Sequence, residues 1–245
     1  GVGAAADSRS AVSKDDGPPG GALGAALCRL AADGAAEWVA WLLAAAPEQR
    51  PAVPPGGNCR GHWLCLRALG ATRLEQDSAP LLAAALQTAS ETGRGDVIRV
   101  LISARADVRA ADENECTALH WAADRGHAEA CRALLAGGCE VDPQDDDEWT
   151  PLCLAAEVGH VEVCRALLEA RALVNLPDED SRSPLWWAAW RRRTELVGLL
   201  LEHGADPSQG DQSGVTPQGL LNVAAGDDHG GALGRSPPAE WPPGS

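Results

Sequence analysis

A 33-residue period constrains the fold of this chain more than any other feature of its sequence. Similar stretches begin at Ala84, Thr117, Thr150, Ser183 and Thr216. With the first residue of each stretch counted as position 1, the four complete units have Leu at position 3, Ala at position 6, a Leu or Ile pair at positions 18 and 19, and Asp at position 29. Repetition at a fixed period of this size indicates a stacked array of short units rather than a single closed core.

The unit that begins at Thr150 follows the local rules of a helix pair. Thr150 is a suitable N-cap, and Pro151 suits the first helical position, where its missing N–H group costs nothing. Gly159 ends this helix after about two turns, because glycine readily adopts the left-handed conformation. A second helix follows, with Glu162 in its first turn, where a negative charge complements the helix dipole. Helices this short are marginal in water, so each pair must bury its apolar face against the next pair.

The connection between units, from Leu173 to Ser183, contains Pro177 and an acidic run and predicts an extended segment with a turn at its tip. The chain resembles ankyrin repeats through TALHWAADRGHAEACRALLAGGCEVD from Thr117 and TPLCLAAEVGHVEVCRALLEARALVN from Thr150. The resemblance implies an all-α solenoid of stacked antiparallel helix pairs with hairpin-like loops.

Composition and the repeat pattern divide the chain into five parts. We expect a disordered tail over residues 1–22, a divergent repeat over 23–46, a Pro/Gly-rich insertion over 47–80, the repeat array over 81–221, and a Gly/Pro-rich tail over 222–245 that is disordered over 229–245. The divergent repeat is predicted from LCRLAADGAAEWVAWLLAAA, which fits the same template. The pattern fades after 216, as expected of a capping half-repeat.

Charge and cysteine placement narrow the classes of partner and the compartment. The net charge of −15 argues against nucleic acid, which requires a basic face, and favours a protein partner with basic and apolar features. No apolar run approaches the ~20 residues that span a bilayer, so we expect no membrane segment. Cys131 and Cys164 share position 15 of adjacent repeats, too far apart for a disulfide. We therefore expect a monomer in the reducing cytoplasm or nucleus.

Three departures from the ankyrin pattern stand out. His120 alone supplies the histidine that the resemblance implies at position 4, since Cys153 and Trp186 replace it, so we expect stability to depend more on packing. At position 22, Arg105 and Arg171 stand where the other two units have glycine, and a left-handed arginine costs roughly 1 kcal/mol.

The third departure is in the unit from Ser183, which has three tryptophans followed by Arg191, Arg192 and Arg193. Two interpretations remain open. Arg beside Trp is typical of interface hot spots and of cation–π contacts. Alternatively, Trp186 fills the core between repeats and the arginines form a solvated turn.

The resemblance places a partner in the concave groove between the loop tips and the first helix of each unit. The tips contribute Glu113, Asn114, Asp146, Asp147, Trp149, Glu179, Asp180 and Arg182; the helix floor contributes Trp121, Asp124, Arg125, Leu154, Glu157, Val158, Trp187, Trp190 and Arg191. The three residues at position 5, Trp121, Leu154 and Trp187, are expected to form an apolar stripe along the groove.

Catalytic, metal and cofactor sites are not predicted. Cys59, His62 and Cys65 have the side chains of a zinc site but no evident fourth ligand. The repeat geometry brings no Ser/His/Asp or Cys/His set together. The leading hypothesis is therefore a non-catalytic scaffold or adaptor. The alternative is the targeting or regulatory region of a larger enzyme, such as a ubiquitin-ligase adaptor or kinase, or of a channel, whose active domain lies outside this sequence.

Overall fold

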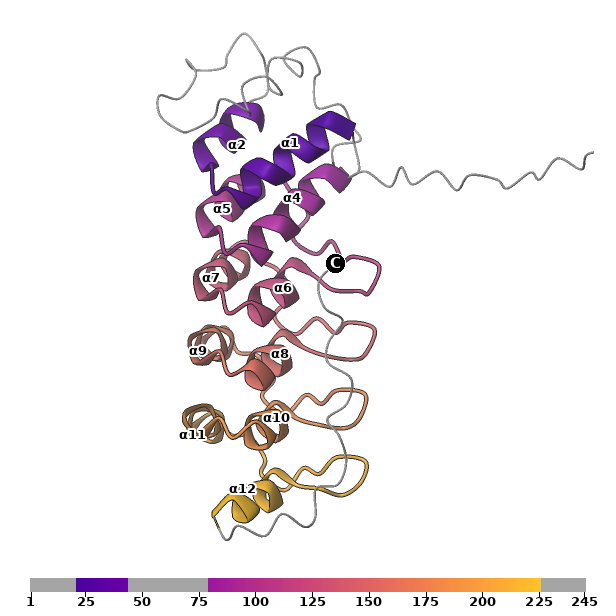
Figure 1. Ribbon diagram of the computed structural model, residues 1–245, viewed down its shortest axis with the longest axis vertical. Coiled ribbons are helices and arrows are strands. Elements are labelled where there is room, and N and C mark those ends of the chain that lie inside the picture. The colour runs from indigo at the N-terminus through magenta and orange to yellow at the C-terminus, as the bar shows by residue number, and fades with distance from the viewer. Residues whose placement is uncertain (1–20, 44–78, 226–245) are drawn as a thin grey trace, which may run out of the picture.

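The helices of this protein form a single stack of antiparallel pairs in a computed structural model, which describes residues 21–43 and 79–225 (Figure 1). The first helices of the pairs are α1 (Gly21–Ala32), α4 (Ala79–Glu91), α6 (Ala118–Asp124), α8 (Pro151–Val158), α10 (Pro184–Trp190) and α12 (Pro217–Ala225). The second helices are α2 (Ala36–Leu43), α5 (Gly95–Ser103), α7 (Ala128–Ala136), α9 (Val161–Glu169) and α11 (Thr194–Glu202). The predicted all-α solenoid is confirmed.

The loops between units are hairpins that project from the row of first helices, on the side opposite the second helices (Figure 1). Within the described ranges, the only β-type pairing is an isolated antiparallel bridge between Ala111 and Thr117, in the first hairpin. The stack therefore has a face on which hairpins and first helices lie together.

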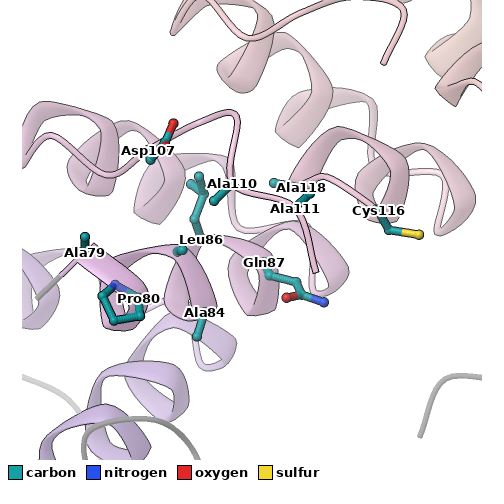
Figure 2. A pocket seen from close by; sticks show the side chains of 11 residues that line it. Ala79, Pro80, Ala84, Leu86, Gln87, Asp107, Ala110, Ala111, Cys116 and Ala118 are labelled. Carbon is teal, nitrogen blue, oxygen red and sulfur yellow. The ribbon is translucent and has the colours of Figure 1, made fainter. Parts of the chain in front are cut away.

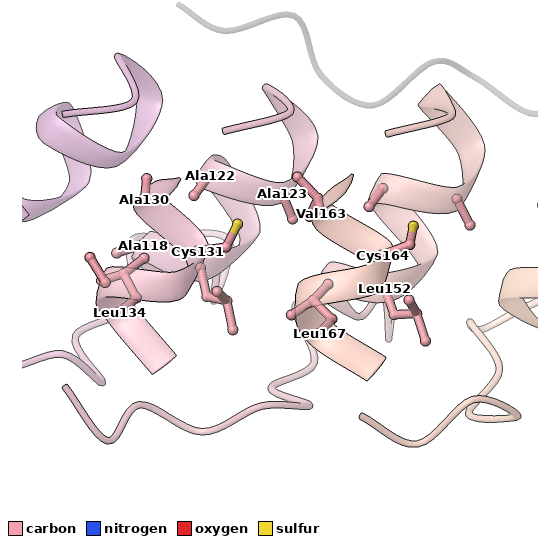
Figure 3. Close-up of a cluster of buried hydrophobic side chains, with 14 of the residues drawn as sticks. Ala118, Ala122, Ala123, Ala130, Cys131, Leu134, Leu152, Val163, Cys164 and Leu167 are labelled. Atoms are coloured by element: carbon pink, nitrogen blue, oxygen red, sulfur yellow. The ribbon is translucent and has the colours of Figure 1, made fainter. Parts of the chain in front are cut away.

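The core runs the length of the stack and uses the repeated apolar positions. The leucines at position 3 and the alanines at position 6 are at most 1% exposed: Leu86, Leu119, Leu152, Leu185, Ala89, Ala122, Ala155 and Ala188. Figure 3 shows Cys131 and Cys164 in equivalent buried places of adjacent units. Both thiols are free, and burial raises the pKa of Cys131 to about 12, so they serve as small apolar side chains.

The predicted helix caps are present. Thr150 Oγ1 accepts from Cys153 N at 3.2 Å, and Gly159 has a φ of +100°. Position 22 is left-handed in every complete unit, with φ of +65° at Arg105 and +68° at Arg171. The two arginines therefore occupy a backbone conformation that suits glycine.

The pair α1–α2 packs on α4 and α5 at the end of the stack. Arg94 Nε donates to Ala32 O at 3.0 Å, just as His127 Nε2 lies 3.0 Å from Glu91 O one unit further on. Gly34 has the left-handed φ of +72° that its counterpart Gly93 also shows. These contacts of α1–α2 resemble those of a regular unit, and the divergent repeat over 23–46 remains a prediction.

Three element boundaries differ from the expectations. Helix α1 includes Gly21 and Ala22, α4 begins at Ala79, and α12 extends to Ala225. Helix α4 is longer than its counterparts because the Ala- and Leu-rich residues at its start continue as helix where other units have the second arm of a hairpin. The remainder of the predicted tails and insertion, including Cys59, His62 and Cys65, lies outside the described residues.

Candidate functional site

Backbone hydrogen bonds join the hairpin tips into one ladder. The tips are residues 112–116, 145–149, 178–182 and 211–215, called the first to fourth tip. Asp146 N donates to Asn114 O at 3.2 Å, Glu179 N to Asp147 O at 3.2 Å, and Gln212 N to Asp180 O at 3.1 Å. Each tip is thereby fixed to the next, and the tips form a continuous edge of the stack (Figure 1).

The repeated aspartate at position 29 shapes each tip. Oδ1 of Asp145 accepts from Asp147 N at 3.0 Å and from Trp149 N at 2.8 Å. Oδ1 of Asp178 accepts in the same way from Asp180 N at 3.0 Å and Arg182 N at 2.8 Å. Equivalent bonds are present at Asp112 and Asp211. The invariance of this residue across the repeats therefore follows from the backbone N–H groups that it satisfies.

The second carboxylate oxygen of this aspartate distinguishes the tips from one another. Trp121 Nε1 donates to Asp112 Oδ2 at 3.0 Å, and Trp187 Nε1 donates to Asp178 Oδ2 at 2.9 Å. In the unit between them, position 5 is Leu154, which has no donor. Oδ2 of Asp145 consequently has no hydrogen-bond partner in the described parts of the chain.

Asp145 is 5% exposed and carries its negative charge in an unfavourable environment. Burial is the main cause that raises the pKa of Asp145 to about 6, and the negative charges of Asp147 and Asp146 raise it further. The hydrogen bonds from the N–H groups of Trp149 and Asp147 lower this pKa, but by less. Burial also raises the pKa of Asp178, but the Trp187 indole and Arg182 oppose the rise. The second tip is therefore the one with an uncompensated buried charge.

The expected apolar stripe along the groove is wrong at two of its three members. Leu154 and Trp187 are each 1% exposed, and only Trp121 is partly exposed. The physical reason is that position 5 faces the aspartate of its own hairpin, so its side chain is covered by that hairpin. Leu154 and Trp187 support the groove from beneath and are not available on its surface.

The tryptophans of the fourth unit pack around Arg182. The rings of Trp149 and Trp187 lie 4.7 Å apart, and those of Trp186 and Trp190 are stacked at 5.2 Å. The Arg182 guanidinium lies 5.2 Å from the rings of both Trp186 and Trp187. These five residues, the tryptophan cluster, join the second and third tips to α10.

Trp186 replaces the histidine that the resemblance implied. His120 Nε2 lies 3.1 Å from Trp149 O in the second tip. Trp186 Nε1 donates at 3.1 Å to Val215 O, the carbonyl oxygen at the same repeat position in the fourth tip. Trp186 is 4% exposed, which agrees with the interpretation that it fills the core between repeats. The link between unit and tip is therefore kept here by a different side chain, which the sequence alone did not reveal.

The arginines of the fourth unit also have structural roles. Arg191 forms an ion pair with Glu157 of the preceding unit. Arg192 has the left-handed φ of +57°, where the other complete units have glycine. Arg193 packs below Gly159, where a Cβ would lie 2.6 Å from its Nε, just as His160 packs below Gly126. Arg191 and Arg192 remain exposed.

The other predicted residues differ in exposure. Exposed are Glu113, Asn114, Asp146, Asp147, Glu179, Arg125, Val158 and Arg191; partly buried are Trp121, Asp124, Trp149, Glu157, Asp180, Arg182 and Trp190. Their role in binding remains a prediction. Glu115 and Glu148, exposed at the tips, were missed, although each directly follows a residue that was predicted to bind, Asn114 and Asp147 respectively.

A cavity of about 390 Å³ lies between α4 and the first hairpin (Figure 2). Its lining includes Ala83, Ala84, Leu86, Ala110 and Ala111. It occurs where α4 takes the place of a hairpin.

In the part of the chain that the structure describes, no three His, Cys, Asp or Glu side chains are placed to hold a metal. None of the described helices has the length and hydropathy that a membrane crossing requires.

Comparison with known proteins agrees with this architecture. The profile of a family described as Ankyrin repeats (3 copies) matches residues 63–145 and 126–211, which together cover more than half of the chain. A search of curated proteins found no match.

Proposed function

Because this chain belongs to the ankyrin repeat family, whose arrays are in general protein-interaction modules, we propose that it is a non-catalytic scaffold or adaptor. Its partner protein docks on the face that the hairpin tips share with the ends of α6, α8 and α10. That face contains the exposed part of the predicted site.

The observation that carries this proposal is the hydrogen-bonded ladder of tips. Separate loops would have to be ordered when a partner binds, at a cost of about 0.5–1.5 kcal/mol for each immobilised side chain. Here each tip is tied to its neighbour through the backbone, and the aspartate at position 29 holds the shape of each tip by accepting from the tip's own N–H groups. The side chains of successive repeats are therefore presented in fixed order before any partner arrives.

Exposed groups on this face indicate the chemistry of the partner. Position 9 places Arg125, Val158 and Arg191 at the ends of three successive helices, and Val158 is 38% exposed. The tips are rich in carboxylates, and the whole chain has a net charge of −15. A partner that joins basic groups to an apolar contact matches these features. The free thiols of the described cysteines support a reducing compartment, the cytoplasm or nucleus.

A pair of matched variants tests the docking face. Val158→Asp places a charge on it, whereas Leu201→Asp changes a residue of similar exposure, 41%, on α11 in the row of second helices. The full chain and both variants would be immobilised, and proteins captured from a cell extract would be quantified by mass spectrometry. We expect Val158→Asp to lose specific captured proteins that Leu201→Asp retains, with equal circular dichroism spectra. Identical capture by both variants would refute the assignment of the face.

A further inference from the structure

We propose that an extended segment of the partner protein packs between α4 and the first hairpin. Two alternate apolar side chains of this segment enter the cavity there, and its backbone carbonyl groups accept from the hairpin. This inference rests on the proposed function and names the chemistry of the partner. The segment extends the row of hairpins at the end where α4 takes the place of one, so its site is continuous with the proposed docking face.

The cavity lies on a hairpin surface that the next unit covers with another hairpin. Asp107 and Ala110 line it at repeat positions 24 and 27 of the first hairpin. Glu140 and Pro143 hold the same positions in the second hairpin, and they face the first hairpin near Val108 across a space of about 30 Å³. The space between the first hairpin and α4 is about 390 Å³. The first hairpin therefore has room beside it for an extended arm.

Backbone donors on the same side of the first hairpin lack the acceptors that later hairpins have. At position 30, the N–H groups of the second, third and fourth tips each donate to a carbonyl group of the preceding tip. In the third and fourth hairpins the N–H group at position 24 also donates backwards, as from Leu173 to the Asp142 side chain at 3.0 Å. The corresponding N–H groups of Glu113 and Asp107, which are both exposed, have no acceptor within residues 21–43 and 79–225. This edge offers donors, so the group that it takes is the carbonyl oxygen of an extended chain.

The lining of the cavity selects the side chains of the segment. Most of it is apolar, and Figure 2 shows Pro80 and Leu86 of α4 on one side and Ala110 and Ala111 of the hairpin on the other. An apolar cavity of about 150 Å³ holds one benzene-sized group, so about 390 Å³ has room for two such side chains. Residues i and i+2 of an extended chain point to the same side. The segment therefore carries two apolar residues separated by one residue.

Two peptides of identical composition test this pattern. Each has eight residues, two of them Leu and the others Ser and Thr. The leucines are at positions 4 and 6 in the alternate peptide and at positions 4 and 5 in the adjacent peptide. Fluorescence anisotropy would measure the affinity of each labelled peptide for the full chain. We expect the alternate peptide to bind about tenfold more tightly, because only this peptide places both leucines in the cavity.

Two pairs of variants locate the binding. Ala83→Phe fills the cavity from α4, whereas Ala136→Phe places the same ring at an exposed position of α7. Glu113→Pro removes the open N–H group at the second residue of a turn that Glu115 N closes on Asp112 O, a place where proline is favoured; Glu113→Ala keeps this N–H group. We expect Ala83→Phe to abolish the preference for the alternate peptide, and Glu113→Pro to weaken its binding about fivefold. The two control variants should leave both affinities unchanged, and all four should keep the circular dichroism spectrum of the natural chain.

Several results would overturn this inference. They are equal or absent binding of the two peptides, an unchanged preference in Ala83→Phe, and equal affinities in Glu113→Pro and Glu113→Ala. A dimer of the full chain in analytical ultracentrifugation that Ala83→Phe abolishes would also overturn it, because a second copy would then occupy the cavity. The proposed function would be unaffected if Val158→Asp still abolished capture.

Discussion

Replacing Asp145 by Asn removes a buried negative charge while keeping the oxygen that shapes the second tip. The amide oxygen of Asn can accept from Asp147 N and Trp149 N as Oδ1 does now. The amide nitrogen then takes the place of an oxygen that has no donor beside it. In Asp178→Asn, by contrast, an amide oxygen that keeps accepting from the tip N–H groups leaves the amide nitrogen facing Trp187 Nε1–H, which is also a donor. Either the indole or the tip N–H groups must therefore lose their acceptor. The two substitutions should therefore change stability in opposite directions.

The expected gain follows from the raised pKa of Asp145. Its rise from 3.8 to about 6 is roughly two units, and each unit corresponds to 1.36 kcal/mol, so the charge costs up to about 3 kcal/mol at neutral pH. Burying the unpaired amide N–H of Asn takes back about 1–3 kcal/mol. We expect Asp145→Asn to stabilise the array by about 1 kcal/mol at pH 7, and Asp178→Asn to destabilise it by about 1–3 kcal/mol.

The effect has a defined pH dependence. Because the folded pKa of Asp145 lies above its unfolded value of 3.8, the folded state binds this proton more tightly. The penalty of the charge is absent below pH 3.8, grows as the pH rises, and is complete above about 6. Urea unfolding of the natural chain and of Asp145→Asn at pH 4 and pH 7 should show the difference mainly at pH 7. If Asp145→Asn is as destabilising as Asp178→Asn, or its effect is independent of pH, the reasoning fails.

Two further substitutions test the repeat interior. Arg105→Gly with Arg171→Gly should stabilise the array by roughly 0.5–1 kcal/mol for each site, since relief of the left-handed strain exceeds the added chain entropy; thermal unfolding checks this, and a lower Tm would contradict it. Trp186→Phe keeps most of the buried ring but removes the donor to Val215 O, so we expect a loss of about 1 kcal/mol and faster amide exchange in α12. Unchanged exchange there would show that the bond does not hold the last helix.

Periodicity was sufficient to predict the stack, the helix pairs and the caps. Thr150, Pro151 and Gly159 are local signals, and the bonds they form span only a few residues. The start of α4 was not predicted because the 33-residue phase places position 29 of the preceding unit at Ala79. An alanine there cannot shape a tip, and the helix begins at that residue instead.

The candidate site was predicted less well, because its side chains are organised by tertiary hydrogen bonds. Helical spacing put Trp121, Leu154 and Trp187 on one face, which is correct, but it could not show that a hairpin aspartate nine residues earlier covers that position. The substitution of His by Trp186 was visible in the sequence, yet the carbonyl it reaches lies 29 residues away. In both cases the partner lies in a hairpin, and helical spacing describes only residues of the same helix.

The junction before α4 shows how this array tolerates added sequence. Gly34 and Gly93 are 59 residues apart, whereas Gly93 and Gly126 are 33 apart, yet both pairs hold equivalent places in the stack. Each doubling of loop length costs only about 0.6 kcal/mol of closure entropy, while burying one leucine such as Leu27 or Leu30 contributes about 1.5–3 kcal/mol. Register in this protein is thus set by neighbouring surfaces and not by contour length, so a whole module could be spliced between two repeats without displacing either.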